Sequence, residues 1–165
     1  MHSPSEVEYG VITNHAEEWD EFKDSQNETG IYSIREDTTQ DFLHSLVSWA
    51  HNNKGEKSSV LLLIDNLEPA ARLNLEAEQN LRWLLLRGPS RRVWPIVTLN
   101  AGRARTLEAL LGFFRTRLFG CIRDPSDSQF VTGISDELLD DLDPGSQFTM
   151  REGDHWLNFR IPNFE

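Results

Sequence analysis

The side chains best placed to do chemistry follow two short apolar runs. Asp65 comes directly after residues 60–64, five consecutive aliphatic residues that predict a strand buried on both faces of a parallel sheet. Thr98 and Asn100 stand at the end of the next such run, residues 93–99. Open parallel sheets bind ligands outside the carboxyl ends of their strands. We therefore expect these three side chains at one ligand-binding edge.

These residue types suit nucleotide hydrolysis. A carboxylate at the Asp65 position can hold Mg²⁺, directly or through water. Glu68, about one turn further on, could polarise the attacking water, and Thr98 or Asn100 could sense the γ-phosphate. The alternative is that Asp65 only caps the turn and helix that follow it, because an apolar run ending in an acid is common in α/β proteins. The residues alone leave both interpretations open.

The phosphate-binding part of such a site is missing from the sequence. No G-x-x-x-x-G-K-[ST] motif occurs, and its nearest approach, Lys-Gly-Glu-Lys-Ser at residues 54–58, lacks the first glycine and the Gly-Lys pair. This segment also precedes a strand, whereas a phosphate loop follows a strand and opens a helix. We interpret it as a solvated connector. The five histidines and the single Cys121 form no zinc-ligand pattern.

The surrounding pattern predicts an α/β fold, with a mostly parallel sheet flanked by helices and a C-terminal antiparallel hairpin. Asn14 and Glu17 have the spacing of a capping box that would start the first helix, whose Trp19 and Phe22 are expected in the core. The whole chain is expected to be a single incomplete domain, with a lead-in at 1–8, an α/β core at 9–134, and a short helix and hairpin at 135–165. Strands are predicted at 9–13, 30–34, 60–64, 93–99, 118–122, 147–151 and 155–161, and the short acidic helix at 135–142. In the hairpin, alternation predicts one buried face made of Phe148, Met150, Leu157, Phe159 and Ile161.

Charge is unevenly distributed along the chain. The net charge is −11, yet residues 72–123 carry ten arginines and three acidic residues. Such a segment can bind phosphate, carboxylate or a neighbouring subunit, although the same arginines could simply lie on solvated helix faces. The longest apolar runs are far below the ~20 residues of a membrane span, and the polar start lacks an apolar signal region. We therefore expect a cytoplasmic protein with no membrane partner.

Taken in order, several segments resemble the later part of an FtsK/SpoIIIE-type DNA translocase motor domain. They are residues 60–68, 80–85, 93–98, 114–120 and 151–156, and the resemblance runs from about Tyr9 to Pro162. It implies a RecA-like P-loop NTPase core that works in a ring, with nucleotide at subunit interfaces and double-stranded DNA in the channel. Asp65 matches the Walker B acid associated with Mg²⁺. Asn66 stands where the family usually has the catalytic acid, and an amide cannot accept a proton, so Glu68 would have to substitute.

The resemblance also places Arg115 or Arg117 near the position of an interface arginine. The first strand and the phosphate loop of that family are absent, so Mg-ATP is expected as a cofactor only if another segment supplies the loop. Our first expectation is an incomplete motor ATPase domain that does not hydrolyse ATP alone and acts by homo- or hetero-oligomeric assembly with motor subunits, with double-stranded DNA in the assembly. The alternatives are the C-terminal piece of an active double-stranded DNA translocase and an interaction scaffold that binds no nucleotide.

Overall fold

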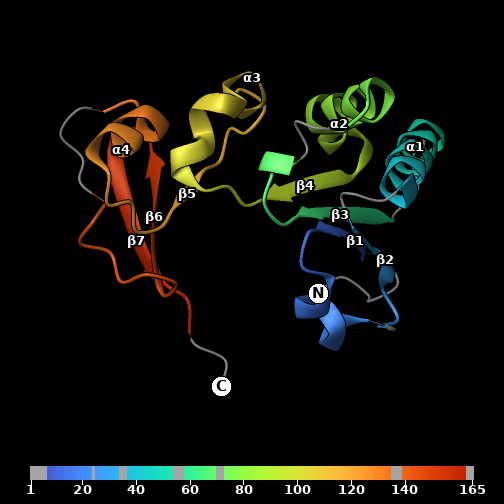
Figure 1. Cartoon of the computed structure of the whole chain (residues 1–165), viewed down its shortest axis with the longest axis horizontal. Helices are drawn as coiled ribbons and strands as arrows, with labels where there is room; N and C mark the ends of the chain where they lie inside the picture. The colour runs from blue at the N-terminus through green and yellow to red at the C-terminus, as the bar shows by residue number, and fades with distance from the viewer. Residues whose placement is uncertain are drawn as a thin grey trace. The chain divides into compact units, whose positions relative to one another are not determined.

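The computed structural model describes residues 7–23, 25–33, 37–53, 58–69, 73–134 and 139–162. The chain divides into two compact units, Met1–Leu99 and Asn100–Glu165. The division therefore falls within the segment 9–134, which was predicted to form one α/β core. Figure 1 traces the first unit in blue to green and the second in yellow to red.

The first unit is built on a four-stranded parallel sheet. The predicted α/β class and the parallel sheet are confirmed, and the strand order is β2-β1-β3-β4. The central pair aligns Val11 with Leu63 and Ile12 with Ile64, so β1 and β3 end together. The strands are β1 (Val7–Thr13), β2 (Glu28–Ser33), β3 (Ser59–Ile64) and β4 (Val93–Val97).

Two helices, α1 (Asp37–Asn52) and α2 (Leu75–Arg87), pack on each other and on this sheet. Val60, Leu62 and Ile64 are fully buried, whereas the intervening residues of β3 are only partly buried. The helices add Phe42, Leu43, Leu46, Ala50, Ala77, Leu81, Leu84 and Leu85 to this core. Gly10 lies on this covered face, because a Cβ there would come within 2.4 Å of the Phe42 ring. The core therefore fixes the strands that carry the candidate site.

The connection after β1 differs from the sequence-based prediction. It forms a 3₁₀ helix, η2 (Ala16–Phe22), which begins after His15 and has no side-chain cap. The capping box of Asn14 and Glu17 was wrong, because the N-cap position falls on His15 and the buried Asn14 Oδ1 accepts no hydrogen bond from the described residues. No residue of η2 is buried, and Phe22 is 51% exposed. The expected core role of Phe22 was therefore also wrong.

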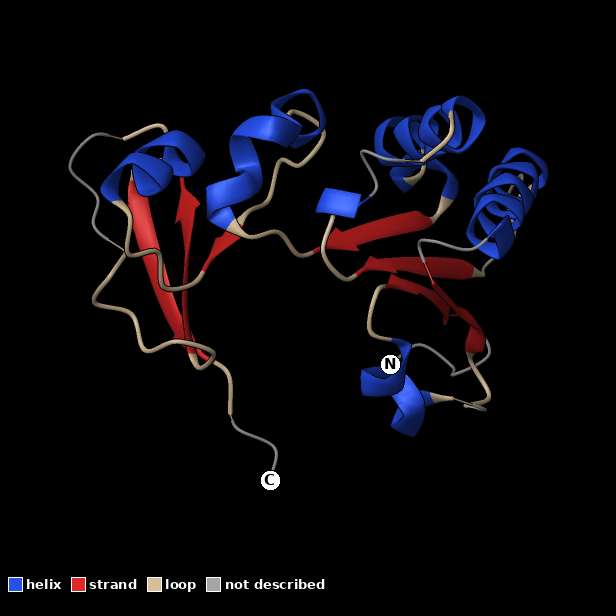
Figure 2. Ribbon diagram, in the orientation of Figure 1, coloured by secondary structure: helices blue, strands red, loops and turns tan. Residues whose placement is uncertain are grey.

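The second unit contains a three-stranded antiparallel sheet of order β5-β6-β7 (Figure 2). The predicted hairpin is confirmed as β6 (Gln147–Glu152) and β7 (His155–Arg160), with Gly153 at a φ of 62° in its two-residue turn. The predicted strand 118–122 is shorter, as β5 (Leu118–Phe119) followed by one bridge between Ile122 and Leu139. The predicted helix at 135–142 falls partly outside the described residues, and Leu139 takes part in that bridge.

The remaining elements of the second unit are short helices. The first unit ends with η4 (Pro89–Arg91) and β4. The second unit then begins with η5 (Ala101–Leu107) and α3 (Glu108–Leu111). An unpredicted helix, α4 (Pro125–Thr132), follows Asp124. The expected buried face of the hairpin was wrong, because Leu157 and Ile161 are 44% and 43% exposed while Thr149 on the opposite face is 3% exposed. No helix in the described ranges is long and apolar enough to cross a membrane.

Asp124 caps α4, and this gives the helix a pH dependence. The Ser126 hydroxyl, with the backbone N–H groups of Asp127 and Ser126, holds the pKa of Asp124 below its usual value. A carboxyl whose folded pKa is depressed stabilises the fold above its unfolded pKa, and this contribution disappears as pH falls through the folded pKa. We expect the melting temperature to fall with acidification more in the native chain than in Asp124→Asn, which keeps a capping oxygen. Equal acid sensitivity of both proteins in thermal scans would contradict this.

Candidate functional site

Asp65 lies at the carboxyl edge of the parallel sheet, directly after β3. Its backbone N–H donates to the Ile12 carbonyl at 2.8 Å, which fixes it beside β1. Its carboxylate accepts two side-chain hydrogen bonds, from the Thr13 hydroxyl to Oδ2 and from the Thr98 hydroxyl to Oδ1, both at 3.1 Å. Three neighbouring strands therefore converge on this one carboxylate, and the two threonines hold it from both sides.

Both threonine hydroxyls also accept a backbone hydrogen bond, and this fixes their orientation. Thr13 Oγ1 accepts the His15 N–H at 3.0 Å, and Thr98 Oγ1 accepts the Asn66 N–H at 2.8 Å. Each hydroxyl has a single proton, and in this arrangement the proton is directed at Asp65. Thr98 was predicted at the site, whereas Thr13 was missed. Its position as a hydroxyl residue at the end of the first predicted strand, 9–13, could have indicated that it belongs to the same edge as Asp65.

The backbone amides after β3 are all occupied within the fold. The Leu67 N–H donates to the Thr98 carbonyl at 2.9 Å, and the Glu68 N–H donates to Asn66 Oδ1 at 3.0 Å. Together with the bonds of Asp65 and Asn66 described above, four consecutive amides have partners in the chain. A phosphate cradle consists of backbone N–H groups that face the ligand. Residues 65–68 therefore offer no such cradle, although they stand at the edge where a ligand is expected.

Asn66 acts in the turn. It has a φ of 66°, in the left-handed region that asparagine tolerates better than most residues. Its side-chain oxygen caps the amide of Glu68, so the amide group at the expected catalytic position stabilises the turn after the strand. Glu68 follows in the same turn and is partly buried. The structure thus gathers Asp65, Asn66, Glu68 and Thr98 in one segment of the first unit.

The other predicted site residues belong to the second unit. Asn100 caps η5, because its side-chain oxygen accepts the Gly102 N–H at 3.0 Å. Arg117 donates to three backbone carbonyls, those of Leu111 at 2.9 Å and of Phe114 and Val131 at 3.3 Å. Its guanidinium therefore ties the end of α3 to α4.

Arg115 differs from Arg117 in its surroundings. Its side chain is exposed, and the structure records no hydrogen bond or ion pair for it among the described residues. Arg105, another arginine of this segment, donates to the Ser126 carbonyl at 2.8 Å and lies 4.7 Å from the Phe130 ring centre. Of these three arginines, Arg115 is thus the one without a recorded partner among the described residues.

The ligand set at Asp65 fits a hard cation only in part. Carboxylate and hydroxyl oxygens are the atoms that Mg²⁺ prefers, and each Asp65 oxygen has a lone pair beyond its threonine bond. Within the described ranges, no group of three or more His, Cys, Asp or Glu side chains comes together as a metal cage. Mg²⁺ at Asp65 would therefore take its remaining ligands from phosphate and water, which is how Mg²⁺ is commonly held with nucleotides.

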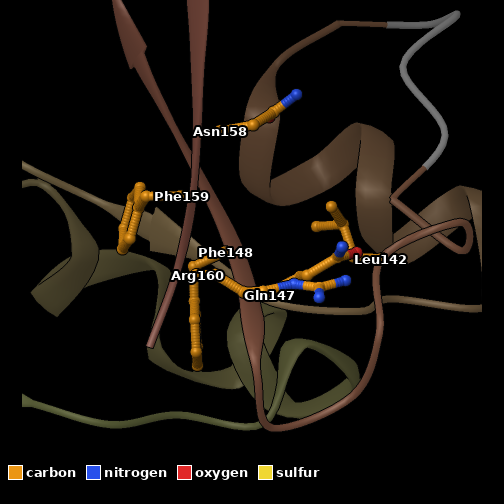
Figure 3. Close-up of a pocket in the computed structure, with 6 residues that line it drawn as sticks. All are labelled: Leu142, Gln147, Phe148, Asn158, Phe159 and Arg160. Carbon is orange, nitrogen blue, oxygen red and sulfur yellow. The ribbon is translucent and has the colours of Figure 1, made fainter. Parts of the chain in front are cut away.

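A separate hollow of about 280 Å³ lies in the second unit, on the hairpin. Figure 3 shows Phe159 on one side of the strand, and Asn158 and Leu142 on the other. The lining residues are Leu142, Gln147, Phe148, Asn158, Phe159 and Arg160. Arg160 is the one charged residue among these six, and its guanidinium pairs with Asp143 at 2.9 Å.

Comparisons with known proteins identify solved structures of similar fold. No protein-family model and no curated protein matches the sequence. EssC (ATPases 2 and 3) from Geobacillus thermodenitrificans aligns with a TM-score of 0.74 and 14% identity, over 96% of this chain and 34% of that one. The pCW3 conjugation coupling protein TcpA, solved with ATPγS, aligns with a TM-score of 0.70 and 14% identity, over 95% and 52%.

A third similar structure is EccC (ATPases 2 and 3) from Thermomonospora curvata, solved with a signal sequence peptide. It aligns with a TM-score of 0.73 and 11% identity, over 99% of this chain and 32% of that one. This chain therefore spans between about a third and about half of each of these three solved chains. At these identities the likeness concerns the fold, and it agrees with the parallel sheet and flanking helices described above. The chain thus has the α/β fold of RecA-like ATPase domains.

Proposed function

We propose that this chain is an incomplete FtsK/SpoIIIE-like motor ATPase domain, which handles Mg-ATP at the Asp65 edge only when another segment supplies a phosphate loop. The observation that carries the proposal is the Asp65 carboxylate held between Thr13 and Thr98 at the carboxyl end of a RecA-like parallel sheet. The need for another segment is supported by the backbone N–H groups of residues 65–68, which all donate within the chain and so cannot bind a triphosphate.

In this proposal each residue of the edge has a limited task. Asp65 holds Mg²⁺, directly or through water, and Thr13 and Thr98 orient its carboxylate. Glu68 is the acid that would orient or deprotonate water, because Asn66 has no acidic group and serves the turn. When bound, Mg²⁺ would neutralise charge on the phosphate oxygens. Among the two predicted interface arginines we favour Arg115, since the contacts of Arg117 are with its own unit.

The proposed partners are motor subunits, as the same chain or as a complete ATPase, with double-stranded DNA in the assembly. The structural neighbours support this assignment only through their own activities, since EccC is a Type VII secretion ATPase and TcpA is a conjugation coupling protein. On the same grounds we propose that the protein is located in the cytoplasm and has no membrane partner.

The proposal is tested with Mn²⁺ as a paramagnetic substitute for Mg²⁺, together with ATP and the isotope-labelled full chain. Weak coordination of the metal by Asp65 does not require the loop, so we expect Mn-ATP to broaden the amide signals of Thr13, Asp65 and Thr98 selectively at millimolar concentration, and Asp65→Asn to abolish the effect. Asp141→Asn, an exposed acid of the second unit, is the matched control and should behave like the native chain. Calorimetry with Mg-ATP should show no saturable heat below about 1 mM, because the phosphate cradle is missing.

Two results would decide against this assignment. Absence of selective broadening would leave the scaffold that binds no nucleotide as the better description. Tight calorimetric binding that depends on Asp65 would instead show that the chain completes its own phosphate site, and the active translocase would then replace the incomplete domain.

A further inference from the structure

Within the part of the chain that the structure describes, strand β7 is an unpaired edge of the C-terminal sheet. It pairs with β6 on one side only, and five of its six residues are exposed. The ladder determines which backbone groups face outward. Ile161 N–H donates to the Ser146 carbonyl, so residues 161, 159, 157 and 155 direct their backbone groups toward β6. The backbone groups of Trp156, Asn158 and Arg160 therefore point away from the sheet, and no hydrogen bond to them is recorded in the described chain.

This edge lacks the devices that usually prevent strand addition. Natural edge strands are blunted by proline, bulges, short length or charged side chains, and the one arginine of β7, Arg160, is already paired with Asp143. β7 has six residues, no proline and a regular register with β6, from Glu152 opposite His155 to Gln147 opposite Arg160. The other sheet offers a contrast. Its edge strand β4 contains Pro95, and the Val93 amide of that strand is occupied by the Gly88 carbonyl.

The side chains of β7 are complementary to those of β7 from a second copy of the chain, when the two strands run antiparallel. With Asn158 opposite Asn158 of a second copy, Leu157 lies opposite Phe159 and Phe159 opposite Leu157. These two residues are 44% and 36% exposed, so pairing them removes apolar surface from water. On the other face Trp156 lies opposite Arg160, which places a cation beside an indole ring.

The same register satisfies the backbone. Because Trp156, Asn158 and Arg160 all point outward, the pairs 156 with 160, 158 with 158 and 160 with 156 are the hydrogen-bonded pairs of an antiparallel ladder. No like charges face each other, and the ion pair of Arg160 with Asp143 offsets the arginine charge on each copy. Shifting the register by one residue would place Leu157 and Phe159 out of contact with each other.

We propose that two copies of this chain associate through antiparallel pairing of their β7 strands, centred on Asn158. The two three-stranded sheets then join into one sheet of six strands. This interface does not depend on nucleotide at the Asp65 edge. It is small compared with a standard protein interface, so the dimer is concentration-dependent.

The register is tested by disulfide formation in the Cys121→Ser background, which removes the single native cysteine. Asn158→Cys places two thiols on directly opposite residues, whose Cα atoms are about 5.5 Å apart in a hydrogen-bonded pair and within the range that a disulfide spans. His155→Cys is the matched control, because His155 is exposed and its two copies are six residues out of register, roughly 20 Å apart along the strand. We expect mild oxidation to give a covalent dimer with Asn158→Cys, at least fivefold more than with His155→Cys.

A second variant tests the edge without a new thiol. Asn158→Pro removes an outward N–H that the β6–β7 ladder does not use, so the hairpin should persist, as judged by the amide signals of β6 in an isotope-labelled sample. In light scattering, the native mass should rise with concentration toward twice 19.0 kDa, and Asn158→Pro should remain at 19.0 kDa. A native chain that stays monomeric, or equal cross-linking of both cysteine variants, would overturn the proposal.

Discussion

Replacing Arg117 with alanine is expected to destabilise the second unit by about 2–3 kcal/mol, because a charged donor to several backbone carbonyls is lost. The carbonyls of Leu111, Phe114 and Val131 would lose their partner, and the partly buried site gives water only limited access to them. The expected signature is faster amide hydrogen exchange in β6 and α4, with the first unit unchanged.

Arg115→Ala is the matched control for this experiment. Its side chain is exposed, so its removal should change stability by less than about 0.5 kcal/mol, as is usual for surface substitutions. If both variants exchanged at the native rate, the three carbonyl contacts of Arg117 would not be stabilising. If Arg115→Ala were the more damaging variant, our choice of Arg115 as the arginine available to a partner would be wrong.

The second large effect is expected at Thr13. Thr13→Val keeps the shape of the side chain but leaves Asp65 Oδ2 and the His15 N–H without their hydroxyl partner. Thr13 is 1% exposed, so water cannot replace the hydroxyl, and the expected loss of stability is about 1–3 kcal/mol. Urea denaturation followed by fluorescence of the tryptophans in the first unit measures this loss.

Two related variants make the Thr13 experiment specific. Thr13→Ser retains the hydroxyl and should recover most of the stability. Thr98→Val removes the equivalent hydroxyl on the other side of Asp65, but Thr98 is exposed, so water can satisfy the groups left behind and the loss should be smaller. A cost at Thr98 equal to that at Thr13 would mean that burial does not distinguish the two hydroxyls.

The central strand and the parallel sheet could be predicted from sequence, because a short, continuous aliphatic run between polar segments is typical of a strand inside a parallel sheet. The order of the strands in the sheet could not be predicted from the sequence. Thr13 reaches Asp65 only because β1, not β2, is the neighbour of β3, and nothing in the local pattern specifies that neighbour. The capping box at Asn14 failed because η2 begins one residue later than predicted, with His15 at the N-cap position.

Burial was the least predictable property of the second unit. Alternation in the hairpin correctly predicted which residues share a face, but it could not show whether another element covers that face, and Leu157 and Phe159 are exposed. Helix α4 did have a readable signal, Asp124 followed by Pro125, which is typical of a helix start. The chemical roles assigned to Asp65, Glu68, Asn100 and Arg115 stay predictions, which the binding experiments with Mn-ATP and Mg-ATP test.

The strand order also determines when the first unit can fold. β1 is made first, yet its partners in β3 lie 52 residues later, as in the hydrogen bond between Thr13 and Asp65. Closing so long a loop costs entropy before any contact is gained, so this ladder forms slowly compared with a local hairpin. The last strand of the sheet ends at Val97, before the second unit begins at Asn100. During synthesis the sheet can therefore close as an independent unit while the later residues are still being added.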